Sequence, residues 1–373
     1  MKQIINLKYR KITILVAFLN MFTALSFGQE YTETRRITKT YDCNASTTIE
    51  VSNKYGRVHV LPWDKDSVQF DIILNIKTNS IPRLKKLKNN VDFDFTVTSY
   101  FINATTVFNN NKYNSFFSDL KSITESLIPS DNEIVIDYTI KVPQKIMLNI
   151  SNKYGDIYID DLSGEISISI SNGDLKANKL LGKTYIGISF GNININYLNE
   201  GKVEASYADV RVREAKALII ESKSSNIDVD KSKMLKIDSK RDKYIVGEVE
   251  NFTGESYFTD IQTQKLTKDL NLNLKYGNIY IQNIIKEFSL ININSEYTDI
   301  ELFVQRGTSY LLDITHSPDA YLRLPGENAD IQEKEVNEET KEMLTYGKVG
   351  TAETSSKLKL SAMKKCNISI MQR

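Results

Sequence analysis

A short motif recurs along this chain at nearly constant spacing, and that spacing constrains the fold more than any other feature. The sequence Ser-Asn-Lys-Tyr-Gly stands at 52–56 and again at 151–155, each time followed by alternating apolar residues. Shorter versions keep an Asp or Asn just after the turn, in what is here called the Asx column. Its members are Asp156, Asp174, Asn192, Asp209, Asn226, a degenerate Lys243, Asp260, Asn278 and Asp299, at successive intervals of 18, 18, 17, 17, 17, 17, 18 and 21 in the numbering.

The apolar pattern follows the same spacing. Eight of the nine residues directly after the Asx column are Ile, Leu or Val, and the ninth is Tyr244. Apolar residues two apart point to one side of a strand, and one such unit cannot bury that side alone. Stacking the units about 4.8 Å apart closes a continuous core. The period is too short for helical repeat families, which need about 33 residues or more. We therefore predict an all-β, single-stranded parallel β-solenoid (β-helix) with 17–18-residue coils, flanking capping strands and one irregular insertion.

Gly, Asp and Asn are expected to form the turn between the two strands of each unit, because they tolerate positive φ and bond nearby backbone. A calcium ladder along the Asx column is the alternative, but the Gly-rich nonapeptide of calcium-binding β-rolls is absent. The predicted structural turn motif comprises Asn53, Tyr55, Gly56, Asn152, Tyr154, Gly155, Asp156, Gly173, Asp174, Gly191, Asn192, Asp209, Asn226, Asp260, Gly277, Asn278 and Asp299.

Aromatic residues recur two positions before the Asx column. This column has two interpretations: a ladder that stabilises the stack, which we favour, or a stacking surface for a sugar ring or a peptide. Besides Tyr154, its members are Phe190, Tyr207, Phe258, Tyr276 and Tyr297, which we take as a candidate contact ladder.

The segment from Met1 to Gly28 reads as a signal peptide. Four basic residues precede an apolar run at 12–27, and Ser26 and Gly28 place small residues before a cleavage site at Gln29. An uncleaved membrane anchor is the alternative. No second hydrophobic stretch follows, so we expect an exported chain with no transmembrane segment after cleavage. Cys43 and Cys366 either pair in an oxidising compartment or are two unrelated buried thiols.

The remaining organisation is expected as follows. Residues 29–143 form N-terminal strands with an insertion at 80–132 that caps the solenoid, residues 144–324 form the repeats, and residues 325–373 form an acidic loop and capping strands. The insertion contains a basic run at 83–88 and an amphipathic helix at 116–128. The acidic loop spans 327–345, and the strands at 357–361 and 367–370 close the second end.

Charge and motif content exclude several function classes. The 48 basic and 47 acidic side chains leave no basic surplus for nucleic acid. His59 and His316 stand at unrelated positions, so no catalytic triad or metal site is expected, and no cofactor is predicted. Solvent-facing strand residues are mixed, and Arg211 with Asp228 is expected to be an ion pair between neighbouring coils. We expect a protein that is not an enzyme; a β-helix polysaccharide-active enzyme is the alternative.

The sequence resembles a bacterial family of unknown function whose members are named as proposed adhesins. The match rests on the two Ser-Asn-Lys-Tyr-Gly copies, on Val-His-Val at 58–60 with Trp-Asp at 63–64, on Tyr-Thr-Ile-Lys-Val-Pro at 138–143, and on Asp-Asp-Leu-Ser-Gly at 160–164. It implies a β-solenoid of a Gram-negative envelope, in the periplasm, on the outer-membrane surface or secreted, similar to adhesin head domains. We therefore expect an adhesion or protein-interaction module with a protein or glycan partner. A scaffold that polymerises end to end is the alternative.

Overall fold

The structure, a computed structural model, describes residues 30–108 and 133–373. Its strands form one large, mostly parallel sheet, and α2 (Ile81–Asn90) is the one helix among the described residues. The all-β prediction is confirmed. The expected signal peptide at 1–28 and helix at 116–128 lie outside the described residues. The chain divides into two compact units: the first holds the described residues of 30–35, 74–92, 108 and 133–135, and the second holds 36–73, 93–107 and 136–373.

The first unit is built around α2. It also contains the start of β1 (Tyr31–Asp42), the end of β4 (Ser67–Thr78), and the first residues of β5 (Val91–Val97) and β7 (Glu133–Pro143). The helix begins after an extended Ser80 with Pro82 in its first turn, where the missing N–H of proline is harmless. The basic run at 83–88 thus belongs to a helix.

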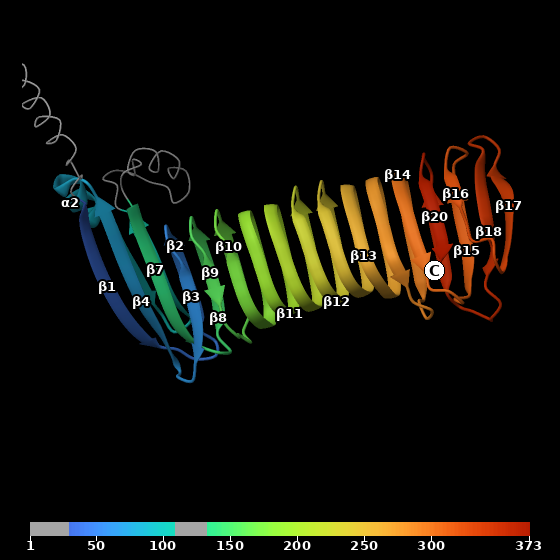
Figure 1. Cartoon of the computed structure of the whole chain (residues 1–373). Helices are drawn as coiled ribbons and strands as arrows, with labels where there is room; N and C mark the ends of the chain where they lie inside the picture. Colours follow the sequence, from blue (N-terminus) through green and yellow to red (C-terminus); the bar gives the residue numbers. More distant parts are fainter. Residues whose placement is uncertain (1–29, 109–132) are drawn as a thin grey trace, which may run out of the picture. The chain divides into compact units, whose positions relative to one another are not determined.

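The second unit contains long strands that bend through successive coils: β10 (Ile166–Ser171), β11 (Leu175–Lys223), β12 (Asn226–Lys240), β13 (Lys243–Ile284) and β14 (Leu290–Val304) (Figure 1). Each segment pairs in parallel with the one after it. Ile168 lies opposite Ile186, Asn226 opposite Lys243, and Asn278 opposite Asp299. These offsets equal the spacing of the Asx column, so the members of that column lie on adjacent strands.

The core lies inside these coils. The register aligns Ile150, Ile168 and Ile186 into one buried column, while the residues between them are more exposed. Burial of such side chains stabilises the stack by roughly 25 cal/mol per Å² of apolar surface. Gly254 interrupts this column opposite Ile237, and the backbone explains why. Its φ is +140°, and a Cβ there would lie 2.0 Å from the carbonyl oxygen of Ile237.

The first coils do not follow sequence order. The coil made of β2 (Thr48–Lys54) and β3 (Val58–Trp63) lies between two others. On one side it pairs with β6 (Phe101–Phe108) and β7, and on the other with β8 (Met147–Lys153) and β9 (Ile157–Ile159). The expected insertion at 80–132 therefore contains a strand of the stack, β6, because the free edge of β2 gives residues 101–105 a parallel partner.

The C-terminal strands are also displaced from the expected place. Strands β19 (Lys357–Ala362) and β20 (Asn367–Gln372) pair with β14 on one side. On the other side they pair with β15 (Tyr310–His316) and β16 (Tyr321–Arg323). They therefore do not close the end of the stack, and the prediction that they do is wrong.

The expected acidic loop at 327–345 is instead largely a hairpin of β17 (Ala329–Asn337) and β18 (Glu342–Val349). Strand β18 pairs antiparallel with β15 and so satisfies backbone groups that would otherwise form an open edge. Both faces of β17 are mostly exposed, so its sequence lacks the apolar alternation that signals a strand.

Candidate functional site: an exposed aromatic ladder

In each coil that carries a member of the Asx column, the residue two positions before that member adopts a left-handed backbone conformation. This corner column comprises Tyr154, Asn172, Phe190, Tyr207, Ser224, Arg241, Phe258, Tyr276 and Tyr297, with φ between 52° and 60°, and Tyr55 at the equivalent place with φ 66°. The turn was expected to place Gly, Asp or Asn at positive φ. Gly277 does so. The other turn glycines, Gly56, Gly155, Gly173 and Gly191, and the Asx column do not, so the expectation is wrong for them. The bend is made by the corner residue, which is usually aromatic.

Stacking offsets the strain of this conformation. A left-handed non-glycine residue costs about 1–2 kcal/mol, and an aromatic pair contributes about 0.5–1.5 kcal/mol beyond its burial. The rings of Tyr55 and Tyr154 stack with centroids 5.5 Å apart, and those of Phe190 and Tyr207 with centroids 5.2 Å apart. The parallel register thus turns a local strain into a repeated contact.

Among the described residues, the longest run of rings lies towards the later coils. The Tyr276 ring stacks on Phe258 with a centroid distance of 4.7 Å and on Tyr297 with 5.1 Å. Tyr257, which sequence reasoning missed, contacts Phe258 edge-on at 4.6 Å. Its position one residue before the corner column is the signal that could have revealed it. Lys275 Nζ lies 5.8 Å from the centroid of the Tyr276 ring, close enough for a cation–π contact.

These rings are about half exposed, and they form three separate runs. Tyr154, Phe190, Tyr207, Phe258 and Tyr297 are 48, 56, 52, 48 and 45 % exposed. Asn172 separates the first run from the second, and Ser224 with Arg241 separates the second from the third. The structure therefore brings the candidate contact residues together as Phe190 with Tyr207 and as Phe258 with Tyr276 and Tyr297. Within a run the rings cover each other's faces and present their edges to solvent.

The asparagine of each Ser-Asn-Lys-Tyr-Gly motif lies inside the corner. Asn53 Nδ2 donates to the carbonyl oxygen of Ile136 at 2.9 Å, and Asn152 Nδ2 donates to that of Gly56 at 2.9 Å. The glycine is required by close packing, since a Cβ on Gly155 would lie 1.9 Å from the Gly56 oxygen. These two residues join neighbouring coils at the corner.

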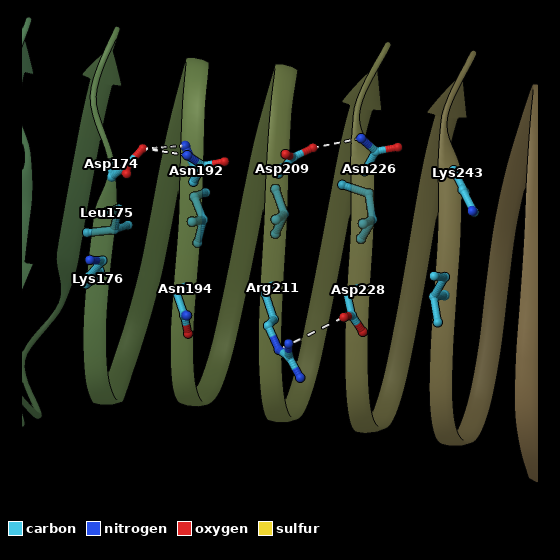
Figure 2. Close-up of a pocket in the computed structure, with 14 residues that line it drawn as sticks. Asp174, Leu175, Lys176, Asn192, Asn194, Asp209, Arg211, Asn226, Asp228 and Lys243 are labelled. Carbon is cyan, nitrogen blue, oxygen red and sulfur yellow. Dashed lines mark hydrogen bonds and ion pairs between the residues drawn. The ribbon is translucent and has the colours of Figure 1, made fainter.

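The Asx column forms hydrogen bonds between coils rather than within its own turn. Asp174 Oδ1 accepts from the backbone N–H of Asn192 at 3.0 Å and from its Nδ2 at 2.9 Å, and Asn226 Nδ2 donates to Asp209 Oδ1 at 2.8 Å (Figure 2). Beside this column the side chains of Arg211 and Asp228 point toward each other, with Nε and Oδ2 4.0 Å apart. The column borders a shallow pocket of about 390 Å³. The carboxylates that line the pocket, Asp174, Asp209 and Asp228, are each bonded to a side chain of a neighbouring coil, and the arrangement does not pair a nucleophile with a base.

A buried polar cluster occupies the corner where the ladder is interrupted. Asp242, 6 % exposed, accepts at Oδ2 from Ser222 Oγ at 2.8 Å, Ser239 Oγ at 2.7 Å and Lys240 N at 2.9 Å. Its Oδ1 accepts from the backbone N–H of Ser225 at 2.7 Å. This cluster was not predicted. Its signal in the sequence is the group of Ser and Asp residues around the degenerate Lys243.

The two histidines lie apart, on β3 and on β15. His316 is buried, with Nε2 3.1 Å from Thr345 Oγ1 and Nδ1 3.0 Å from the carbonyl oxygen of Ser317. Cys43 and Cys366 are both buried and unpaired. Within residues 30–108 and 133–373, no group of three or more His, Cys, Asp and Glu side chains is placed to hold a metal ion. Of the helical residues described, no stretch is long and apolar enough to cross a membrane.

Comparison with known proteins identifies no family. No protein-family model matches the chain, and no curated protein matches it in sequence. Solved structures with partial likeness include a proposed cell adhesion protein of Clostridium sporogenes. It is 8 % identical in sequence, the match covers 91 % of this chain and 100 % of that chain, and the TM-score is 0.19. A proposed adhesin of Bacteroides fragilis has 11 % identity, coverage of 91 % and 96 %, and a TM-score of 0.27. A proposed lipid-binding protein of Parabacteroides distasonis has 14 % identity, coverage of 92 % and 96 %, and a TM-score of 0.29. These values are too low to bear on what this chain binds.

Proposed function

We propose that this chain is an exported, non-catalytic β-solenoid that binds a partner protein along its corner ladder, meaning the aromatic residues of the corner column. The observation that carries the proposal is the run of Phe258, Tyr276 and Tyr297, which stays about half exposed at its ends although each ring is large and apolar. Tyr side chains are enriched at the energetic centres of protein interfaces. The parallel pairing of each coil with the next, at the offset of the sequence repeat, supports the solenoid.

A protein partner fits this ladder better than a glycan. A sugar ring binds most favourably over an open aromatic face, and within the runs those faces are covered by the next ring. The exposed edges, together with Lys275 and the Lys240 ammonium 6.0 Å from the Tyr257 ring, offer mixed apolar and charged contacts. Such a combination is typical of protein interfaces.

A binding module is also favoured over an end-to-end scaffold. Strand β17 pairs with β18, and its exposed side chains include Asp330, Glu333 and Glu335. Charged residues on an outer strand oppose pairing with another copy.

The test compares three forms of the purified exported chain on arrays of bacterial envelope proteins and of glycans. The ladder variant carries Phe258→Asn, Tyr276→Asn and Tyr297→Asn, because Asn tolerates the left-handed conformation. The control variant carries Lys176→Ser and Asn194→Ser beside the Asx column. Circular dichroism establishes that all three forms fold.

We expect saturable binding to a protein target that the ladder variant loses and the control variant keeps. Equal binding by the two variants would refute a role for the ladder. Binding confined to glycans would refute the protein partner, and a monomeric chain that binds no target would refute the binding function.

A further inference from the structure

The corner ladder lacks one ring at Asn172, between Tyr154 and Phe190. Neighbouring strands lie about 4.7–4.9 Å apart, so these two rings, two coils apart, are separated by roughly 10 Å. Stacked neighbours elsewhere in the corner column have centroid distances of 4.7 to 5.5 Å. A ring placed midway would therefore stack about 5 Å from both, within the range of favourable aromatic pairs.

Asn172 does not replace the missing ring. Its backbone has φ 55°, like the aromatic members of the column, but its short side chain is exposed and its Nδ2 donates to Ser171 Oγ on the same coil at 3.0 Å. Phe190, which borders the gap, is 56 % exposed, whereas Tyr276, stacked on both faces, is only partly exposed. The gap thus leaves open the faces of Tyr154 and Phe190 that a neighbouring ring would cover in an uninterrupted run.

The other interruption differs. Two successive corner positions are non-aromatic there, and one of them carries the long side chain of Arg241. The distance from Tyr207 to Phe258 spans three coil spacings, roughly 14 Å, and does not match a single ring. Among the residues that the structure describes, only the gap at Asn172 has the width of one ring between two open aromatic faces.

We propose that the gap at Asn172 is a binding slot for one planar ring, supplied by an aromatic side chain of the partner protein. This inference rests on the proposed function and names the part of the partner that is recognised. The chain's own Tyr and Phe side chains occupy the equivalent positions in other coils, so a flat aromatic ring is the group known to fit this geometry. A pyranose chair is thicker and puckered, and it fits the gap less well.

The test fills the slot from within. Asn172→Tyr supplies the missing ring, and the fold should accept it because Tyr already occupies corner positions with φ of 53° to 66°. Ser224→Tyr is the matched control, since it extends the ladder next to Tyr207 and leaves the slot open. The probes are 4-methylphenol and 3-methylindole, which represent Tyr and Trp side chains, and methyl β-glucoside, which represents a sugar.

Binding is followed by NMR as shifts of the backbone amides of residues 171–173 and by saturation transfer to the probe. We expect concentration-dependent shifts with the two aromatic probes in the wild type and in Ser224→Tyr, and about a tenfold or larger loss of affinity in Asn172→Tyr. No shift at Asn172, or equal affinity in Asn172→Tyr, would overturn the slot. Binding of the glucoside in place of the aromatic probes would overturn the aromatic occupant.

The array separates this inference from the proposed function. If Asn172→Tyr keeps a protein target that the triple ladder variant loses, the slot is refuted and the proposed function stands. If the aromatic probes bind at Asn172 while the array yields no protein target, the slot stands and the proposed function fails.

Discussion

Replacing Asp242 with alanine should destabilise the coils around it more than any comparable change on the surface. The carboxylate is buried and accepts four hydrogen bonds, two from backbone N–H groups and two from serine hydroxyls. The hydroxyls have other partners within reach, since Ser222 Oγ lies 2.6 Å from Tyr244 Oη and Ser239 Oγ lies 2.8 Å from Thr259 Oγ1. The N–H groups of Ser225 and Lys240 would lose the carboxylate and remain inside the corner.

The magnitude follows from those two groups. A buried donor without an acceptor costs about 1–3 kcal/mol, so Asp242→Ala should lower the free energy of unfolding by about 4 kcal/mol. Asp209→Ala is the control, because that exposed carboxylate is joined to Asn226 Nδ2 by a side-chain bond worth about 1 kcal/mol or less.

The assay is hydrogen exchange of peptides from residues 220–260, because stacked coils can open locally rather than in one transition. A change of about 4 kcal/mol corresponds to faster exchange by nearly three orders of magnitude. An increase of less than about tenfold, or one equal to that of Asp209→Ala, would show that the buried carboxylate does not hold the corner together.

Three further predictions concern packing, the C-terminus and charge. Gly173→Ala should lower the free energy of unfolding in urea by about 2 kcal/mol, because its Cβ would meet the Gly155 oxygen at 2.1 Å. Gly326→Ala, whose Cβ meets no atom within 4 Å, should be neutral, and equal urea midpoints for the two variants would contradict this. Removing residues 357–373 should expose the edges of β14 and β15, and light scattering should then detect association of the truncated chain. A truncated chain that remains monomeric, with unchanged hydrogen exchange in β14, would argue against the placement of β19 between β14 and β15. Burial, followed by the charge of Lys153, lowers the pKa of Lys54 from 10.5 to about 8. Between pH 8 and 10.5 the unfolded chain then binds more protons than the folded chain, so the free energy of unfolding should rise with pH from about 8 to 10.5. Lys54→Met should remove that rise, and an identical dependence of stability on pH in the variant would exclude Lys54 as its source.

Much of the second unit could be predicted from spacing alone. The Asx column and the apolar columns repeat at one nearly constant spacing, and a strand pairs in parallel with its successor at the same offset, as Asp209 does with Asn226. The aromatic column could also be predicted, because rings at one register position must approach each other when coils stack. The alignment of the aromatic column depends only on neighbouring coils, so it can be predicted without knowing how the two ends of the stack are built.

The corner geometry could not be predicted in the same way. Gly and Asn are the usual residues at positive φ, yet Tyr and Phe take that place here because stacking on a neighbouring coil offsets a strain that the isolated segment would avoid. The buried contacts of Asp242 were likewise hidden, since two of its four hydrogen-bond partners, Ser222 and Ser225, come from the neighbouring coil.

The sequence by itself determined the repeating strand, its period and which side chains face inward, because these depend on alternation within each coil and on constant spacing between coils. Only the tertiary structure decided the order of the terminal coils and the hairpin of β17 and β18. Those pairings satisfy whichever strand edges remain open after the central coils have stacked, and open edges are a property of the assembled sheet. The gap at Asn172 belongs to the same class, because a missing ring becomes a slot only when stacked coils place Tyr154 and Phe190 on either side of it.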